Sequence, residues 1–123
     1  MSNPPLISVV DDDESVRESL SGLIRSVGFG VTVFASAEEF LNSNHLSDTN
    51  CLILDVRMPG MNGLELQRRL AASHRSIPVI FITAHGDPAT RAKIERVLPG
   101  TPVLAKPITA ERLKEAIASV MKG

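Results

Sequence analysis

The chain contains no tryptophan, no tyrosine and a single cysteine, Cys51. A lone cysteine excludes a framework of internal disulfides and suits a reducing compartment. No apolar stretch approaches the ~20 residues that a membrane-spanning helix needs, and the amino-terminal sequence MSNPPL lacks the basic and apolar regions of a secretory signal peptide. We therefore expect a cytoplasmic protein without membrane contact.

Charge of one sign is also scarce, because 13 basic and 14 acidic residues leave a formal net charge of −1. No overall field favours nucleic acid or an anionic membrane surface, and we expect no direct nucleic-acid binding. A chain of 123 residues, of which 43% are hydrophobic, is long enough to bury a core as one domain. We expect a single domain over residues 1–123, with an ordered core at about residues 5–122.

Short apolar runs alternate with segments of helical period along the chain. The runs that predict strands are residues 6–10, 31–34, 51–54, 78–83 and 102–105. Between them, apolar residues recur every three or four positions, as over residues 16–27 and 63–72, which predicts helices. Ser36, Asp87 and Thr109 have the residue type and the position of helix N-caps.

Three of the predicted strands, residues 6–10, 51–54 and 78–83, are almost continuously apolar. This is typical of central strands in a parallel sheet that helices cover on both faces. Because strand and helix alternate five times, we predict an α/β fold built on a doubly wound parallel sheet. Ligands of such sheets bind beyond the carboxyl ends of the strands.

Charged and hydroxyl side chains stand where four of the predicted strands end. They are Asp11, Asp12 and Asp13 after the first strand, Asp55 after the third, Thr83 at the end of the fourth and Lys106 after the fifth. Clustered carboxylates repel one another, and a hard cation relieves this repulsion. Oxygen ligands without histidine or cysteine favour Mg²⁺, for which Mn²⁺ could substitute.

Each of these residues also has an ordinary structural explanation. An acidic run such as DDDE often begins a solvated helix, and a strand-end aspartate such as Asp55 often caps a loop. Thr83 could simply end a strand, and Lys106 could be a surface charge. Their occurrence together favours a site in which Asp55 is a nucleophile that becomes an aspartyl phosphate, while a metal, Thr83 and Lys106 contact phosphoryl oxygens.

Three motifs resemble the receiver domain of bacterial two-component response regulators. DVRMPGMNG at 55–63 is similar to the phosphorylation loop of that family, PVIFITAHGD at 78–87 to its fourth-strand switch segment, and AKP at 105–107 to its Lys-Pro motif. The segments SAEEFL and ITAHGD are closest to the nitrogen-fixation-regulator type. The resemblance implies a flavodoxin-like (βα)5 fold with strand order 2-1-3-4-5.

The resemblance also implies a metal site and a reaction. Asp12, Asp55 and the backbone carbonyl of Arg57 would hold Mg²⁺, with Asp11 reaching it through water, and Asp13 would cap the first helix. A phosphoryl group would pass from the phosphohistidine of a sensor histidine kinase, or from a phosphotransfer protein, to Asp55. Such a domain is a signalling switch and not a turnover enzyme.

The implied response to phosphorylation involves Thr83 and Lys106 and changes binding to an output domain or a downstream protein. Two departures from the family pattern concern this step: Val103 replaces the usual Tyr or Phe, and PGTP at 99–102 replaces the usual apolar helix end. Val103 is stiff at χ1 and has no ring to turn between two environments. We expect the signal to leave through residues 83–87 and the helix that follows.

Two other functions stay open at this point. A phosphatase of the haloacid-dehalogenase type also forms an aspartyl phosphate, but it requires D-x-D, and here Arg57 stands two residues after Asp55. A pseudo-receiver would bind partners without phosphorylation. The intact acidic set argues against it, and Val103 argues for it. His85 lies near the site, and we expect no catalytic role for it.

Overall fold

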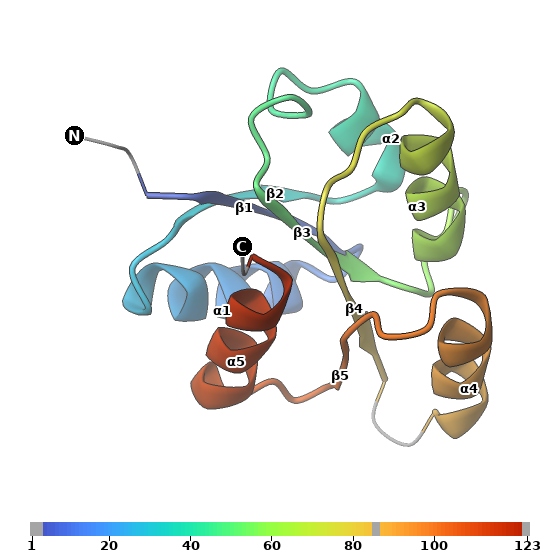
Figure 1. Ribbon diagram of the computed structural model, residues 1–123. Helices are drawn as coiled ribbons and strands as arrows, with labels where there is room; N and C mark the ends of the chain where they lie inside the picture. Colours follow the sequence, from blue (N-terminus) through green and yellow to red (C-terminus); the bar gives the residue numbers. More distant parts are fainter. Residues whose placement is uncertain (1–3, 85–86, 122–123) are drawn as a thin grey trace.

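The structure, a computed structural model, describes residues 4–84 and 87–121, and its centre is a parallel sheet (Figure 1). The strands are β1 (Leu6–Val10), β2 (Gly30–Phe34), β3 (Cys51–Asp55), β4 (Val79–Thr83) and β5 (Val103–Ala105). Their order is β2-β1-β3-β4-β5, and every neighbouring pair is parallel. The predicted flavodoxin-like strand order is confirmed.

A helix follows each strand, and the helices cover both faces of the sheet. They are α1 (Glu14–Ser26), α2 (Ala37–Leu41), α3 (Gly63–Ala72), α4 (Pro88–Val97) and α5 (Ala110–Val120). Figure 1 shows α1 and α5 together on one face, and α2, α3 and α4 on the other. No helix within the described residues is both long and apolar enough to cross a membrane.

Two apolar cores result from the alternation of side chains along the central strands. On one face, Val10, Leu54 and Phe81 pack with side chains of α2, α3 and α4. On the other face, Ile7, Ile53 and Ile80 pack with α1 and α5. Every residue of β3 and β4 is buried, as the continuous apolar runs predict. Burying one Leu or Ile fully contributes about 1.5–3 kcal/mol, so the buried residues of β3 and β4 contribute strongly to the stability of the sheet.

Side-chain caps fix where the helices begin. The carboxylate of Asp13 accepts from the amide of Ser15 at the start of α1, and Ser36 and Thr109 cap α2 and α5 in the same manner. The cap of α4 by Asp87 is also present. These predicted caps are confirmed, since each depends only on local sequence. Asn62, which caps α3, was not predicted.

Two strands begin one residue later than predicted. Pro78 and Pro102 precede β4 and β5 and do not belong to them, because a proline nitrogen has no hydrogen to donate to a sheet. Both residues still support the sheet through their carbonyls, which accept from the amides of Leu52 and Phe81. The two prolines therefore lie just before β4 and β5 and accept a hydrogen bond from the neighbouring strand at that point.

Candidate functional site

Three aspartates meet at the carboxyl edge of the sheet. Asp11 directly follows β1, Asp55 ends β3, and Asp12 lies beside them, so that one oxygen from each carboxylate lies within 4.8 Å of the others. Asp11 is fully buried, Asp55 is 6% exposed and Asp12 is exposed. The parallel strands bring these residues together although 44 positions separate Asp11 from Asp55.

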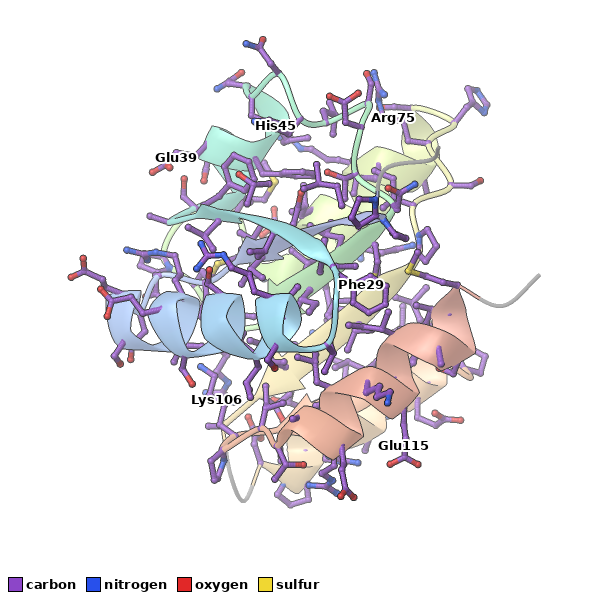
Figure 2. All side chains as sticks on the ribbon, turned by 90° about the vertical axis from the view of Figure 1, so that its left-hand side faces the viewer. Phe29, Glu39, His45, Arg75, Lys106 and Glu115 are labelled. Atoms are coloured by element: carbon purple, nitrogen blue, oxygen red, sulfur yellow. The ribbon has the colours of Figure 1, made fainter. Side chains whose placement is uncertain are left out.

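Lys106 provides a positive charge at this edge. Its Nζ lies 3.3 Å from Asp11 Oδ2 and 3.7 Å from Asp55 Oδ2. The backbone of Lys106 is fixed by a 2.9 Å hydrogen bond from its amide to the carbonyl of Thr83, and its peptide bond to Pro107 is cis. Figure 2 shows Lys106 between α1 and the start of α5, far from His45. One ammonium therefore faces two of the three carboxylates.

The surroundings of Asp55 disfavour the ionised form of its carboxyl group. Burial, followed by the neighbouring charge of Asp11, raises the pKa of its carboxyl to about 7, although Lys106 acts in the opposite direction. Two buried carboxylates at this distance cannot both ionise at no cost. Asp11 Oδ2 also lacks a hydrogen-bond donor among the described residues, although Lys106 lies near it as an ion-pair partner. The site therefore holds more carboxylate charge than Lys106 alone can balance, which favours binding of a cation.

The acidic residues fit a hard divalent cation. Opposite ligands of an ion bound at about 2.1 Å are about 4.2 Å apart, which small adjustments of three oxygens within 4.8 Å can meet. The donors are carboxylate oxygens, which Mg²⁺ and Mn²⁺ prefer. The exposed Asp12 leaves room for the retained waters that Mg²⁺ keeps.

A cavity of about 150 Å³ adjoins Asp55. Its lining includes the hydroxyl-bearing Thr83 at the end of β4 and the ammonium-bearing Lys106. Thr83 is 2% exposed, and its hydroxyl has no hydrogen-bond partner among the described residues. A buried hydroxyl without a partner costs about 1–3 kcal/mol, so this group is available to a polar ligand in the cavity.

Arg57 has a second feature that the sequence reasoning missed. Its backbone carbonyl was the predicted metal ligand, but its guanidinium also lies 3.3 Å from the carboxylate of Asp87 and 3.4 Å from the hydroxyl of Thr90. The Thr90 hydroxyl in turn donates to Asp87 at 2.7 Å. These three residues, the Arg57 cluster, connect the loop after β3 to the start of α4. The adjacency of β3 and β4 is the signal that could have indicated it.

Two further residues that the sequence reasoning missed shape the loop after Asp55. A Cβ atom on Gly63 would lie 2.6 Å from the carbonyl oxygen of Asp55, so only glycine allows this approach. The carboxylate of Glu38, on α2, accepts from the amide of Met61 at 3.2 Å. Glycine at the start of α3 was the visible signal for the first contact, whereas nothing local points to the second.

The remaining sequence predictions near the site have simple outcomes. Asp13 caps α1 and is not among the converging carboxylates. His85, for which we expected no catalytic role, lies outside the described residues, as does Gly86 of the same loop. Val103, which replaces the family's aromatic residue, is partly buried against the core on the α3 and α4 face.

Comparison with known proteins gives the family. Residues 7–118 match the response regulator receiver domain. The chain is 44% identical over 117 residues to the response regulator protein TodT of Pseudomonas putida, a match that covers 95% of this chain and 51% of TodT. It is 38% identical over 116 residues to the transcriptional regulatory protein FixJ of Bradyrhizobium diazoefficiens, covering 94% of this chain and 56% of FixJ. The chain thus spans about half the length of these curated relatives.

The fold comparison agrees with the sequence comparison. The crystal structure of FixJ-N matches with a TM-score of 0.82 and 35% identity, over 99% of this chain and 96% of that one. This supports the predicted nitrogen-fixation-regulator type. With its strand order, its acidic pocket and these matches, the chain belongs to the response regulator receiver domain family, whose members are signalling switches of two-component systems and bind Mg²⁺ at such a pocket.

Proposed function

We propose that the chain is one receiver domain in which Asp55 accepts a phosphoryl group. The observation that carries this proposal is the position of Asp55. It ends a fully buried central strand, beside two other aspartates and Lys106, and it opens onto a cavity that also contains the Thr83 hydroxyl. A carboxylate that faces an ammonium group and opens onto a small cavity, with a hydroxyl that has no partner among the described residues, suits in-line attack on phosphorus.

The donor is the phosphohistidine of a sensor histidine kinase or of a phosphotransfer protein. A carboxylate oxygen of Asp55 forms the new bond to phosphorus as the phosphorus–nitrogen bond breaks. The electron pair of that bond stays on the imidazole nitrogen, which takes up a proton. Lys106 faces the reacting carboxylate and stabilises the negative charge of the transferred group.

Asp11, Asp12, Asp55 and the backbone carbonyl of Arg57 are the residues that hold Mg²⁺ in this proposal, with Asp11 acting through water. Mn²⁺ would be held in the same way. The ion supplies charge neutralisation on the phosphoryl oxygens. Ionised Asp55 is the nucleophilic form, and both the metal and Lys106 favour it over the protonated form that burial favours.

An apolar cavity of about 480 Å³ beside the site suits the donor protein. Val16 and Leu20 of α1 line it together with Lys106, Pro107 and Ile108. A phosphohistidine presented on a helix could place its apolar neighbours there, while its phosphoryl group faces Asp55. The shared residue, Lys106, links this surface to the chemistry.

Phosphorylation then changes how the Thr83 and Lys106 side of the domain binds an output domain or a downstream protein. We place the domain in the cytoplasm and assign it no turnover reaction and no direct contact with nucleic acid or membrane. A phosphatase of the haloacid-dehalogenase type is less well supported, because the residue two positions after Asp55 is Arg57, whose side chain pairs with Asp87. A pseudo-receiver is disfavoured by the complete acidic set.

The test is the intact mass of the protein after incubation with acetyl phosphate, with and without Mg²⁺. We expect one added phosphoryl group that requires Mg²⁺ and is removed by hydroxylamine, as an acyl phosphate is. Asp55→Asn should accept none, whereas Asp48→Asn, which changes an exposed aspartate in a loop, should behave as the wild type. Hydroxylamine-resistant phosphate on Asp55→Asn would contradict the proposal, and no phosphate on the wild type would favour the pseudo-receiver.

A further inference from the structure

The Arg57 cluster connects two segments that the sheet alone leaves separate. Arg57 belongs to the loop that follows β3, whereas Asp87 is the N-cap of α4 and Thr90 lies in its first turn. Asp87 has several roles at once. It caps α4 through the amide of Thr90, accepts from the Thr90 hydroxyl, and pairs with the Arg57 guanidinium.

The cluster also borders the space that the phosphoryl group would enter. Arg57, Asp87 and Thr90 line the same cavity of about 150 Å³ as Asp55. The Arg57 side chain is 75% exposed, whereas that of Asp87 is 17% exposed. The arginine is therefore the member of the pair with freedom to move, and Asp87 is held by its contacts with Thr90.

We propose that Arg57 is a phosphoryl-binding residue that exchanges partners: it pairs with Asp87 in the resting domain and moves to the phosphoryl oxygens when Asp55 is phosphorylated, releasing the start of α4. This inference rests on the proposed function of Asp55. It assigns a role in signalling to the side chain of Arg57, of which only the backbone carbonyl takes part in the proposed metal site.

Charge and geometry favour the exchange. A phosphoryl group carries about 1.5 to 2 negative charges near neutral pH, compared with one on Asp87. A guanidinium binds phosphate oxygens with two parallel hydrogen bonds. The resting pair is exposed on the Arg57 side, and exposed ion pairs are weak. A weak resting contact and a stronger competing one are the two conditions for an exchange driven by phosphorylation.

Coupling of this kind is reciprocal. If Asp87 holds Arg57 away from the phosphoryl position, then neutralising Asp87 must strengthen binding of a phosphoryl mimic. Asp87→Asn is a suitable change, because asparagine caps a helix about as well as aspartate does. It removes the charge, and it also removes the second carboxylate oxygen, which Arg57 and the Thr90 hydroxyl contact. Arg57→Gln removes the group that is exchanged.

The experiment measures the affinity of beryllofluoride in saturating Mg²⁺ by calorimetry, since the chain has no tryptophan or tyrosine for fluorescence. We expect Asp87→Asn to bind about two- to five-fold more tightly than the wild type, which is the range of exposed ion pairs. Arg57→Gln should bind more weakly. In the Arg57→Gln background, Asp87→Asn should change nothing.

A charge-matched control distinguishes the effect of the Arg57–Asp87 pair from the general electrostatic effect of removing one negative charge. Glu95→Gln removes one negative charge from an exposed position of the same helix, and Glu95 has no ion-pair partner among the described residues. This change should leave the affinity unchanged. A second measurement needs no ligand. In the metal-free domain, the Nε–Hε resonance of Arg57 should move toward that of free arginine in Asp87→Asn. On addition of beryllofluoride and Mg²⁺ to the wild type, it should move to a third position, distinct from both the resting and the free one, because the guanidinium then binds the phosphoryl mimic.

The outcomes are distinct. Unchanged or weaker binding by Asp87→Asn would overturn the inference and leave the role of Asp55 intact. An equal gain in the Arg57→Gln background, or with Glu95→Gln, would also overturn it, because the effect would then not pass through Arg57. Failure of the wild type to bind beryllofluoride with Mg²⁺ would instead refute the proposed function, and the inference with it.

Discussion

At the scale of single residues, the site combines groups that are poorly satisfied at rest. Asp55 has a pKa raised to about 7 by burial and by Asp11, and the hydroxyl of Thr83 is buried without a partner among the described residues. Each condition lowers stability in the resting state and, in the proposed function, is relieved when a cation and a phosphoryl group bind. Such local conflict is expected where a protein is built for a ligand and not for stability alone.

The raised pKa of Asp55 predicts a pH-dependent stability. The ordinary value is 3.8, so between about pH 4 and pH 7 the unfolded chain releases a proton that the folded domain keeps. Its free energy of unfolding therefore falls as the pH rises through this window and stays low above it. We expect metal-free Asp55→Asn to be more stable than the wild type at pH 7.5, by on the order of 1–3 kcal/mol, and much less so at pH 5.

Thermal unfolding followed by circular dichroism measures this difference. Mg²⁺ should narrow it at pH 7.5, because the metal stabilises the ionised form in the wild type. Asp48→Asn, at an exposed position, controls for the loss of one charge. A gap between Asp55→Asn and the wild type that is the same at both pH values would show that burial of an ionised Asp55 is not its cause.

Substitutions at Thr83 and Lys106 should affect different steps, the response to phosphorylation and the phosphorylation itself. Thr83→Val replaces an unpaired buried hydroxyl with a methyl group of the same shape, so we expect about 1 kcal/mol of added stability and nearly normal phosphorylation, with a weakened response. Lys106→Met removes a charge-assisted contact of about 1.5–3 kcal/mol and should slow phosphorylation strongly. Intact mass as a function of time measures the rates, and equal slowing in both variants would contradict this division.

At the scale of elements, the start of α3 is fitted against the end of β3. The amide of Gly63 donates to the carbonyl of Val56 at 3.1 Å, and the carbonyl of Asp55 lies where a side chain at position 63 would begin. This contact fixes the backbone beside Asp55, the proposed phosphoacceptor. The backbone carbonyl of Arg57, the proposed metal ligand, depends on the same segment.

Gly63→Ala should therefore damage both stability and metal binding. Backbone must shift to relieve a 2.6 Å approach, and we expect a loss of about 1–3 kcal/mol together with weaker Mg²⁺ binding by titration. Gly22→Ala is the matched control, because α1 has open space there, and it should stabilise the domain by about 0.5–1 kcal/mol. Unchanged Mg²⁺ affinity in Gly63→Ala would separate α3 from the metal site.

The elements also show how far sequence could predict this structure. Strands, caps and the meeting of Asp11 with Asp55 were predictable, because hydrophobic period, cap chemistry and parallel topology are carried by local residues or by strand order. The ion pair of Arg57 with Asp87 and the hydrogen bond of Glu38 to Met61 were not. These depend on how two loops and a short helix pack, and no periodic pattern records that packing.

At the scale of the whole molecule, the question is where the signal leaves the site. Val103 is partly buried against the core beside α3 and α4, and it has no ring that could change between two environments. The Arg57 cluster, in contrast, directly joins the loop after β3, which follows the proposed phosphoacceptor, to α4. The start of α4 is therefore the element that phosphorylation can release with the fewest changes elsewhere.

Amide hydrogen exchange with and without beryllofluoride in Mg²⁺ tests this route. We expect the largest changes at residues 84–91 and small ones around Val103, because partner exchange by Arg57 loosens the contacts of Asp87 while β5 keeps its pairing with β4. In Arg57→Gln the changes at residues 84–91 should shrink, whereas Glu95→Gln should reproduce the wild type. Changes centred on β5, with residues 84–91 unaffected, would move the exit of the signal to Val103 and reject α4 as its path.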